Sequence, residues 1–172
     1  MRLKAILKEW VPPLLIAVVL SLLIQTYVAQ AVKVPSGSME PNIQIGDRLV
    51  MEKMLKFTEF RHGDIVVFNH AAENKEKVRY VKRLIGLPGD TIEVKDGALY
   101  RNGEKVDEPY LTVKMAYTFE KVTVPEGHYF FLGDNRNNSY DGHLWPNRFV
   151  AESELVGKVM FRFFPFQHAG PL

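Results

Sequence analysis

The distribution of apolar residues divides the chain into one long apolar segment followed by many short alternating runs. Residues 11–32 (VPPLLIAVVLSLLIQTYVAQAV) carry no formal charge, and Pro12 and Pro13 lie at the start of this segment. A helix of about 20 apolar residues spans the hydrocarbon core of a bilayer, and a helix tolerates proline best in its first turn. We therefore predict one transmembrane helix over residues 11–31, preceded by a short tail over residues 1–10.

The charges that flank the apolar segment predict its orientation. The residues before it include three basic side chains and one acidic side chain, namely Arg2, Lys4, Lys8 and Glu9. Segments rich in Lys and Arg stay on the cytoplasmic side of a membrane. We therefore expect a single-pass protein of the cell membrane, with residues 1–10 in the cytoplasm and residues 32–172 outside it.

Two other interpretations of the apolar segment remain open. It could be a cleavable signal peptide, because Ala29–Ala31 (AQA) has the small-x-small pattern of a cleavage site and Gln25 and Thr26 interrupt the apolar run. It could also be a buried helix, although a charge-free segment at a terminus argues against this. Extraction of membranes with carbonate distinguishes an anchor from a released protein.

The remainder of the chain shows the pattern of a β domain. Gly-Asp pairs precede short runs rich in Val, Ile, Phe or Leu, such as DRLVMEK, DIVVFNH and DTIEVKD. Asp96-Gly97 and Asn102-Gly103 lie between strand-like runs, where such dipeptides form hairpin turns. Further candidate strands are KVRYVKRLIGL, KVTV, HYFFL and GKVMFRFF. We predict a mainly β domain over residues 32–172, sandwich-like or barrel-like.

Composition limits the chemistry that this domain can perform. The 172 residues suit one domain with an appendage, and a formal net charge of +2 gives no electrostatic indication of nucleic-acid binding. The chain has no cysteine, which excludes disulfides, thiolate nucleophiles and cysteine-ligated zinc. None of the five histidines forms an H-E-x-x-H pattern. We therefore expect neither a metal nor an organic cofactor, and the composition does not specify an oligomeric state.

Lys82 is the most informative single residue of the candidate strands. In the run VRYVKRL it shares a face with Val78, Tyr80 and Leu84, because alternate residues of a strand point to the same side. Its ammonium could reach solvent while its stem packs on the sheet. Alternatively, burial could lower its pKa by about 3 units, which would make the neutral amine available as a base near pH 7.

Two further stretches carry candidate chemistry. VKVPSGSMEPN holds Ser36 and Ser38, whose side chains share a face if the backbone is extended. GDNRNNSYDGH could be an ordinary polar loop or could orient the lysine. SGSME does not match the G-x-S-x-G nucleophile elbow, and a Ser-His-Asp triad assembled with His128 or His143 stays an alternative.

These stretches, in this order, resemble the motifs of type I signal peptidases. PSGSMEP, YVKRLIGLPGD and GDNRNNSYDG follow an N-terminal membrane segment, and RHGDIVVF resembles a fourth block that usually has Arg where this chain has His62. The resemblance covers most of the chain and is similar to the compact bacterial forms, which lack a large inserted β-domain. It implies a signal-peptidase-like domain of short, mostly antiparallel strands.

The resemblance also implies roles for the matching positions. Ser38 is implied as the nucleophile, and Lys82 as the general base that later protonates the leaving amine. The backbone N–H of Ser38 and the hydroxyl of Ser36 are implied as the oxyanion hole, and Ser139 as the group that orients Lys82. The residues implied as lining shallow pockets for small substrate side chains are Val34, Pro35 and Val81.

The polar loop both follows the family pattern and departs from it. Asp134 is implied to pair with Arg83 and so to hold the loop against the strand. The family loop commonly ends Asp-Ser-Arg, whereas this chain has Asp141, Gly142 and His143. We expect Asp141 to pair with His143, whose charge depends on pH.

Together these features predict a membrane-bound serine endopeptidase with a Ser38–Lys82 dyad. Its expected partners are the signal peptides of secreted preproteins, cleaved after a small-x-small motif, and the lipid bilayer. Two other functions remain open: a self-cleaving Ser-Lys protease of the repressor type, and a non-catalytic anchored β-domain that binds peptides.

Overall fold

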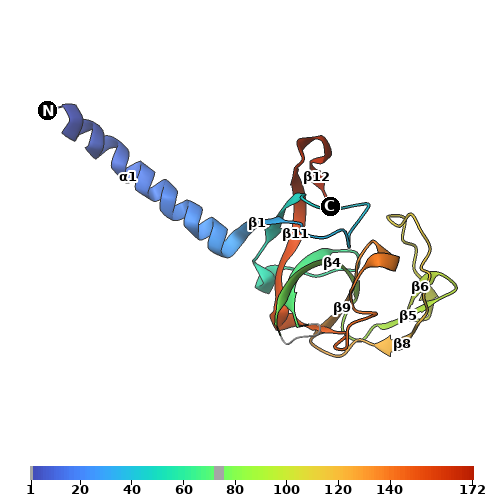
Figure 1. Ribbon diagram of the computed structural model, residues 1–172. Helices are drawn as coiled ribbons and strands as arrows, with labels where there is room; N and C mark the ends of the chain where they lie inside the picture. Colours follow the sequence, from blue (N-terminus) through green and yellow to red (C-terminus); the bar gives the residue numbers. More distant parts are fainter. Residues whose placement is uncertain (1, 72–75) are drawn as a thin grey trace.

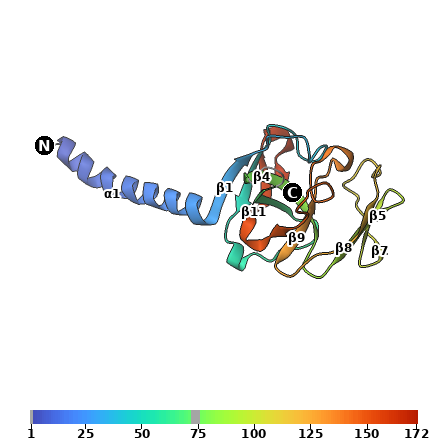
Figure 2. The same cartoon turned by 60° about the horizontal axis from the view of Figure 1, so that its bottom comes forward.

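The computed structural model describes residues 2–71 and 76–172, with side chains from residue 8 onward. Helix α1 (Arg2–Leu23) continues through a π-helical turn (Ile24–Val28) into strand β1 (Ala29–Lys33). Figures 1 and 2 both show α1 projecting from one side of a body made of strands. The segment Lys8–Val28 is long and apolar enough to cross a membrane, and its most apolar part is not buried against the rest of the protein. Residues 29–31, at the end of the expected anchor, belong to β1.

The larger of two sheets forms most of the body. Its strands lie in the order β1-β2-β11-β3-β4-β9-β10, and β12 pairs with β11. Every pairing among the described residues is antiparallel. The strands are β2 (Arg48–Glu52), β3 (Ile65–His70), β4 (Val78–Gly86), β9 (His128–Leu132), β10 (Val150–Ala151), β11 (Leu155–Phe164) and β12 (Gly170–Pro171).

A smaller sheet lies at the end of the body opposite α1, as Figures 1 and 2 show. Its order is β7-β6-β5-β8, formed by β5 (Thr91–Lys95), β6 (Ala98–Arg101), β7 (Glu104–Lys105) and β8 (Phe119–Thr123). The predicted hairpin turns are confirmed. Asp96 and Gly97 have φ of 52° and 73°, and Asn102 and Gly103 have φ of 55° and 84°. These left-handed values suit the tight turns that Asp-Gly and Asn-Gly favour. The prediction of a mainly β, mostly antiparallel domain after one apolar helix is therefore confirmed.

The segment between β1 and β2 has no regular secondary structure, but the core fixes it in place. Val34, Met39 and Ile43 are buried, and each belongs to the same apolar cluster as residues of β2, β3 and β4. The backbone of Val34 donates to Asp47 O at 2.9 Å and accepts from Gly46 N at 2.9 Å. Burying each apolar side chain stabilises the fold by about 1.5–3 kcal/mol. The segment that carries Ser36 and Ser38 is therefore held firmly at both ends.

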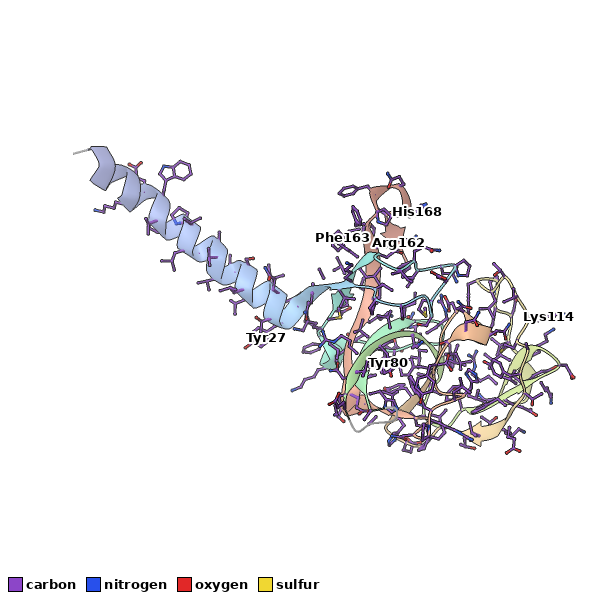
Figure 3. All side chains as sticks on the ribbon, in the orientation of Figure 1. Tyr27, Tyr80, Lys114, Arg162, Phe163 and His168 are labelled. Carbon is purple, nitrogen blue, oxygen red and sulfur yellow. The ribbon has the colours of Figure 1, made fainter. Side chains whose placement is uncertain are left out.

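From their apolar character, Trp145 and the run FRFFPF (residues 161–166) could contact either lipid or the core, and we expect the core for both. Trp145 is 1% exposed and packs with Phe68 and Phe131, as expected. Phe164 and Phe166 are 40% and 79% exposed, so the core expectation is wrong for the run. The reason is topological, because the end of β11 extends beyond the main body in a hairpin with β12, where Figure 3 labels Arg162, Phe163 and His168.

Candidate active site

Ser36 and Ser38 lie in the bend and turn that follow β1. Their hydroxyl oxygens are 3.5 Å apart. An extended backbone would place both side chains on one face, as considered from the sequence, but here a turn brings the two hydroxyls together. Met39, directly after Ser38, is 1% exposed and anchors this turn in the core. Ser38 is thus a partly exposed hydroxyl on a rigidly held turn.

Lys82 lies near the middle of β4, opposite Val66 of β3. The residue is only 2% exposed, so the interpretation in which its ammonium reaches solvent is wrong. Its Nζ donates to Ser139 Oγ at 2.8 Å. Burial lowers the pKa of Lys82 to about 8, although the carboxylates of Asp141 and Asp134 oppose this shift. A buried amine with this pKa can act as a base at neutral pH, because an appreciable fraction is uncharged.

The polar loop after β9 (residues 133–143) brings Ser139 to Lys82. It also binds the bend and turn that carry Ser36 and Ser38 (residues 36–40), which we call the serine turn. Asn135 N donates to Ser38 O at 3.0 Å, and Asn135 Nδ2 donates to Gly37 O at 3.1 Å. A Cβ atom at Gly133 would collide with Ser139 Oγ and with Ser38 O. The loop, the turn and β4 are therefore packed so closely that this position accepts no side chain larger than hydrogen.

Arg83 and Asp134 form the ion pair that the sequence predicted. Arg83 Nε and Nη2 donate to the two carboxylate oxygens of Asp134 at 2.7 and 2.6 Å. Asn42 Nδ2 adds a third hydrogen bond to this carboxylate at 2.8 Å, and the guanidinium lies 4.0 Å from the centre of the Tyr110 ring. Such two-pronged Arg–carboxylate pairs fix orientation as well as charge. The pair joins β4 to the start of the polar loop.

Asp141 and His143 are also brought together. His143 Nδ1 lies 2.6 Å from Asp141 Oδ1, and Asp141 Oδ2 accepts a hydrogen bond from Gly133 N at 2.8 Å. The His143 ring stacks on Tyr117 with a centroid distance of 4.0 Å. Neither His143 nor His128 hydrogen-bonds a serine within the described ranges, so the geometry does not favour a Ser-His-Asp triad.

Two cavities meet at the serine turn. The smaller one, of about 200 Å³, is lined by apolar groups that include Val34, Pro35 and Val81, the three residues expected to line substrate pockets. The larger one, of about 400 Å³, is lined by Lys82 and by polar side chains from the serine turn and the polar loop. Ser36, Ser38 and Tyr80 border both cavities. Tyr80 is labelled on β4 in Figure 3.

A buried ion pair between Arg136 and Glu108 also supports the site, and it was not predicted from the sequence. Arg136 of the polar loop is fully buried and donates to both carboxylate oxygens of Glu108, at 2.8 and 2.6 Å. The two residues are separated by 28 positions, and neither lies in a periodic pattern that would indicate the contact. The loop around Arg136 also carries Asp134 and Asp141, so the sequence gives no indication that Glu108 is the partner.

The chain is similar to known signal peptidases. A family model for signal peptidases, peptidase S26, matches residues 7–164. A signal peptidase I of Bacillus licheniformis is 43% identical, covering 92% of this chain and 89% of the relative. A protein of Synechocystis sp. named "Probable signal peptidase I-2" is 45% identical, covering 91% and 72% of the two chains.

The crystal structure of a signal peptidase I from Enterococcus faecalis V583 is 34% identical, with a TM-score of 0.48, and covers 58% of this chain and 96% of that chain. The family match over residues 7–164 includes most of the apolar N-terminal helix, the serine turn, β4 and the polar loop. The chain therefore belongs to the peptidase S26 family of signal peptidases and is a serine endopeptidase of the signal peptidase I type.

Proposed function

We propose that this signal peptidase removes N-terminal signal peptides with Ser38 as nucleophile and Lys82 as general base. The observation that carries the proposal concerns the Lys82 amine. Lys82 is buried, its amine is hydrogen-bonded to Ser139, and Lys82 and Ser38 line the same cavity. Because the amine is held mostly apart from water, part of it is uncharged near neutral pH and can accept a proton. An ordinary solvent-exposed lysine is almost entirely an ammonium at that pH and cannot.

The reaction begins when Ser38 Oγ attacks the carbonyl carbon of the bond to be cleaved and its proton passes to the Lys82 amine. Lys82 Nζ donates a hydrogen bond to Ser139 Oγ in this structure. This bond orients the amine and leaves its lone pair available to accept a proton. The resulting ammonium gives its proton to the leaving nitrogen, the C–N bond breaks, and the signal peptide stays attached to Ser38 as an acyl ester. Water then attacks the ester carbonyl carbon while Lys82 accepts its proton, and Lys82 returns that proton to Ser38 Oγ as the bond to Ser38 breaks.

The oxyanion that forms during both steps needs preorganised donors. The Ser36 hydroxyl lies 3.5 Å from Ser38 Oγ and is free to rotate toward a substrate oxygen. The backbone N–H of Ser38 donates to no acceptor within the described residues, so it is available as the second donor. One donor of this type contributes about 3–4 kcal/mol to transition-state stabilisation in other enzymes.

The smaller cavity has an apolar lining to which Val34, Pro35 and Val81 contribute from the segment just before the serine turn and from β4. This lining suits uncharged side chains better than charged ones. In keeping with the family resemblance, we propose that the cavity receives small side chains of the small-x-small motif before the cleaved bond.

The N-terminal helix is proposed as a retained, single-pass anchor with residues 1–10 in the cytoplasm. Ala29–Ala31, the candidate cleavage site, is paired with β2 in the register Ala29↔Glu52 to Ala31↔Val50. A protease binds its substrate as an extended, unpaired segment, so this pairing protects the site and supports an intact anchor. The exposed Phe164 and Phe166 are additional candidates for lipid contact.

A preprotein cleavage assay with the full chain in detergent tests the proposal. Ser38→Ala and Lys82→Met are expected to abolish cleavage, and Lys82→Arg likewise, because a guanidinium keeps the charge but does not deprotonate. Normal cleavage by any of these variants refutes the dyad. Binding without cleavage by the wild-type chain supports a peptide-binding domain instead, and cleavage only of its own chain supports a self-cleaving protease.

A further inference from the structure

The position of Lys82 determines which of the two cavities receives the released chain. In the proposed mechanism the Lys82 ammonium protonates the leaving nitrogen, which is the first atom of the mature protein. Lys82 lines the larger cavity, whereas it does not line the smaller apolar one. The first residue after the cleaved bond must therefore enter the larger cavity.

Glu40 places an unpaired carboxylate in this cavity. Within the described parts of the chain, the carboxylate makes no hydrogen bond and no ion pair, although the residue is only partly exposed. It folds back over Gly37, where an added Cβ would lie 2.9 to 3.1 Å from the carboxyl atoms. The absence of a side chain at Gly37 therefore leaves the space that the Glu40 carboxyl group occupies beside the serine turn.

The polar loop contributes a second acceptor to the same wall. Asn135 Nδ2 donates a hydrogen bond to Gly37 O. Asn135 Oδ1 accepts none from the described residues, so it is available to accept one from a substrate. Asn135 and Asn138 line the cavity together with Glu40, and the same three residues line a neighbouring cavity that continues toward Val113. A continuous polar path therefore leads away from Ser38.

We propose, on the basis of the function proposed above, that Glu40 forms a charge-selective subsite for the first residue of the mature chain, with Asn135 Oδ1 as a second acceptor. A carboxylate and an amide oxygen both accept hydrogen bonds, so the subsite favours a cationic side chain and disfavours an anionic one. A charge pair a few ångströms apart at a partly solvated site changes a rate constant by about fivefold.

Three synthetic peptides that differ only in the residue after the cleaved bond test this subsite. They carry Lys, Gln or Glu there and the same small-x-small sequence before the bond. For the full wild-type chain in detergent micelles, kcat/KM is expected to be about fivefold higher for the Lys peptide than for the Gln peptide and about fivefold lower for the Glu peptide, which gives a Lys-to-Glu ratio of about 25. In Glu40→Gln the ratio falls to about one, and in Glu40→Lys it is inverted.

Two controls separate the subsite from other effects. Glu120→Gln removes an exposed carboxylate of β8, which lines neither cavity, and leaves the ratio unchanged. A ratio that persists in Glu40→Gln, or an equal loss of kcat/KM for all three peptides, overturns the subsite. Cleavage of the Gln peptide by wild type and its loss in Ser38→Ala test the proposed function separately, so a wild-type chain that cleaves all peptides equally refutes only the subsite.

Discussion

The titration of Lys82 gives the most direct quantitative prediction. With a pKa of about 8, the amine is uncharged in about 9% of molecules at pH 7 and in about 90% at pH 9. If the neutral amine is the base, kcat/KM rises about tenfold between these pH values and then levels off. A lysine with the ordinary pKa of 10.5 would instead give a rise of about a hundredfold over the same range, with no plateau.

Removal of a neighbouring charge perturbs this profile in a known direction. The Asp141 carboxylate raises the pKa of Lys82 against the larger effect of burial. Asp141→Asn keeps an oxygen to accept from Gly133 N but loses the charge. The midpoint of the rise is therefore expected to move to lower pH, and activity at pH 7 becomes a larger fraction of the plateau activity.

The assay is cleavage of one peptide at substrate concentrations well below KM, measured from pH 6 to pH 10 with the full chain in detergent. The variant His143→Gln is the control for a general disturbance of the polar loop, because it changes a neighbour of Asp141 but keeps both a polar side chain there and the Asp141 charge. A wild-type rate that still increases about eightfold between pH 9 and pH 10, as expected for a lysine with the ordinary pKa of 10.5, refutes a buried, neutral base. An unchanged midpoint in Asp141→Asn refutes the assigned electrostatic coupling.

Three further predictions follow from the packing of the site. Ser139→Ala removes the hydroxyl to which Lys82 Nζ donates a 2.8 Å hydrogen bond. Because hydrogen bonds of charged groups contribute about 1.5–3 kcal/mol, kcat is expected to fall at least tenfold with little change in KM. Gly133→Ala places a Cβ against Ser139 Oγ and Ser38 O, so peptide cleavage is expected to be lost. Lys82→Met removes a buried amine whose lowered pKa costs about 3 kcal/mol of stability at pH 7, so the inactive variant is expected to unfold at a higher denaturant concentration than wild type.

The Lys82→Met prediction includes a pH dependence with a definite sign. Between pH 8 and 10.5 the unfolded chain binds a proton at Lys82 that the folded chain does not, so wild-type stability rises with pH across this window. Lys82→Met lacks this rise. Equal pH dependence of the two proteins contradicts a lowered pKa, an unchanged kcat in Ser139→Ala contradicts the orienting role, and an active Gly133→Ala contradicts the close packing.

The main strands could be predicted because each carries its own local pattern. Asp96-Gly97 and Asn102-Gly103 specify hairpin turns by the backbone conformation that they tolerate, which is a property of the dipeptide. The run around Lys82 likewise indicates a strand with an unusual lysine. These features depend on residues near one another in sequence, so they are visible before the chain is folded.

Other features depend on contacts between distant segments. The burial of Lys82 results from packing against β3 and the polar loop, and only this packing decides between a solvated ammonium and a lowered pKa. The exposure of Phe164 and Phe166 follows from the hairpin of β11 and β12, whereas their apolar character alone favoured the core. The Arg136–Glu108 pair joins two irregular segments and has no local indication at all.

The sequence by itself determined an apolar N-terminal helix, a mainly antiparallel β domain and the residue types of a serine-lysine site. The tertiary structure alone decided that Lys82 is desolvated and that the Glu40 carboxylate, beside the serine turn, has no hydrogen-bond or ion-pair partner among the described residues. It also places Ser139 Oγ 2.8 Å from Lys82 Nζ, as the family resemblance implied. The physical reason is that periodicity and turn preference act between neighbouring residues. Desolvation, by contrast, is the sum of every segment that packs around a group, and it exists only once those segments have come together.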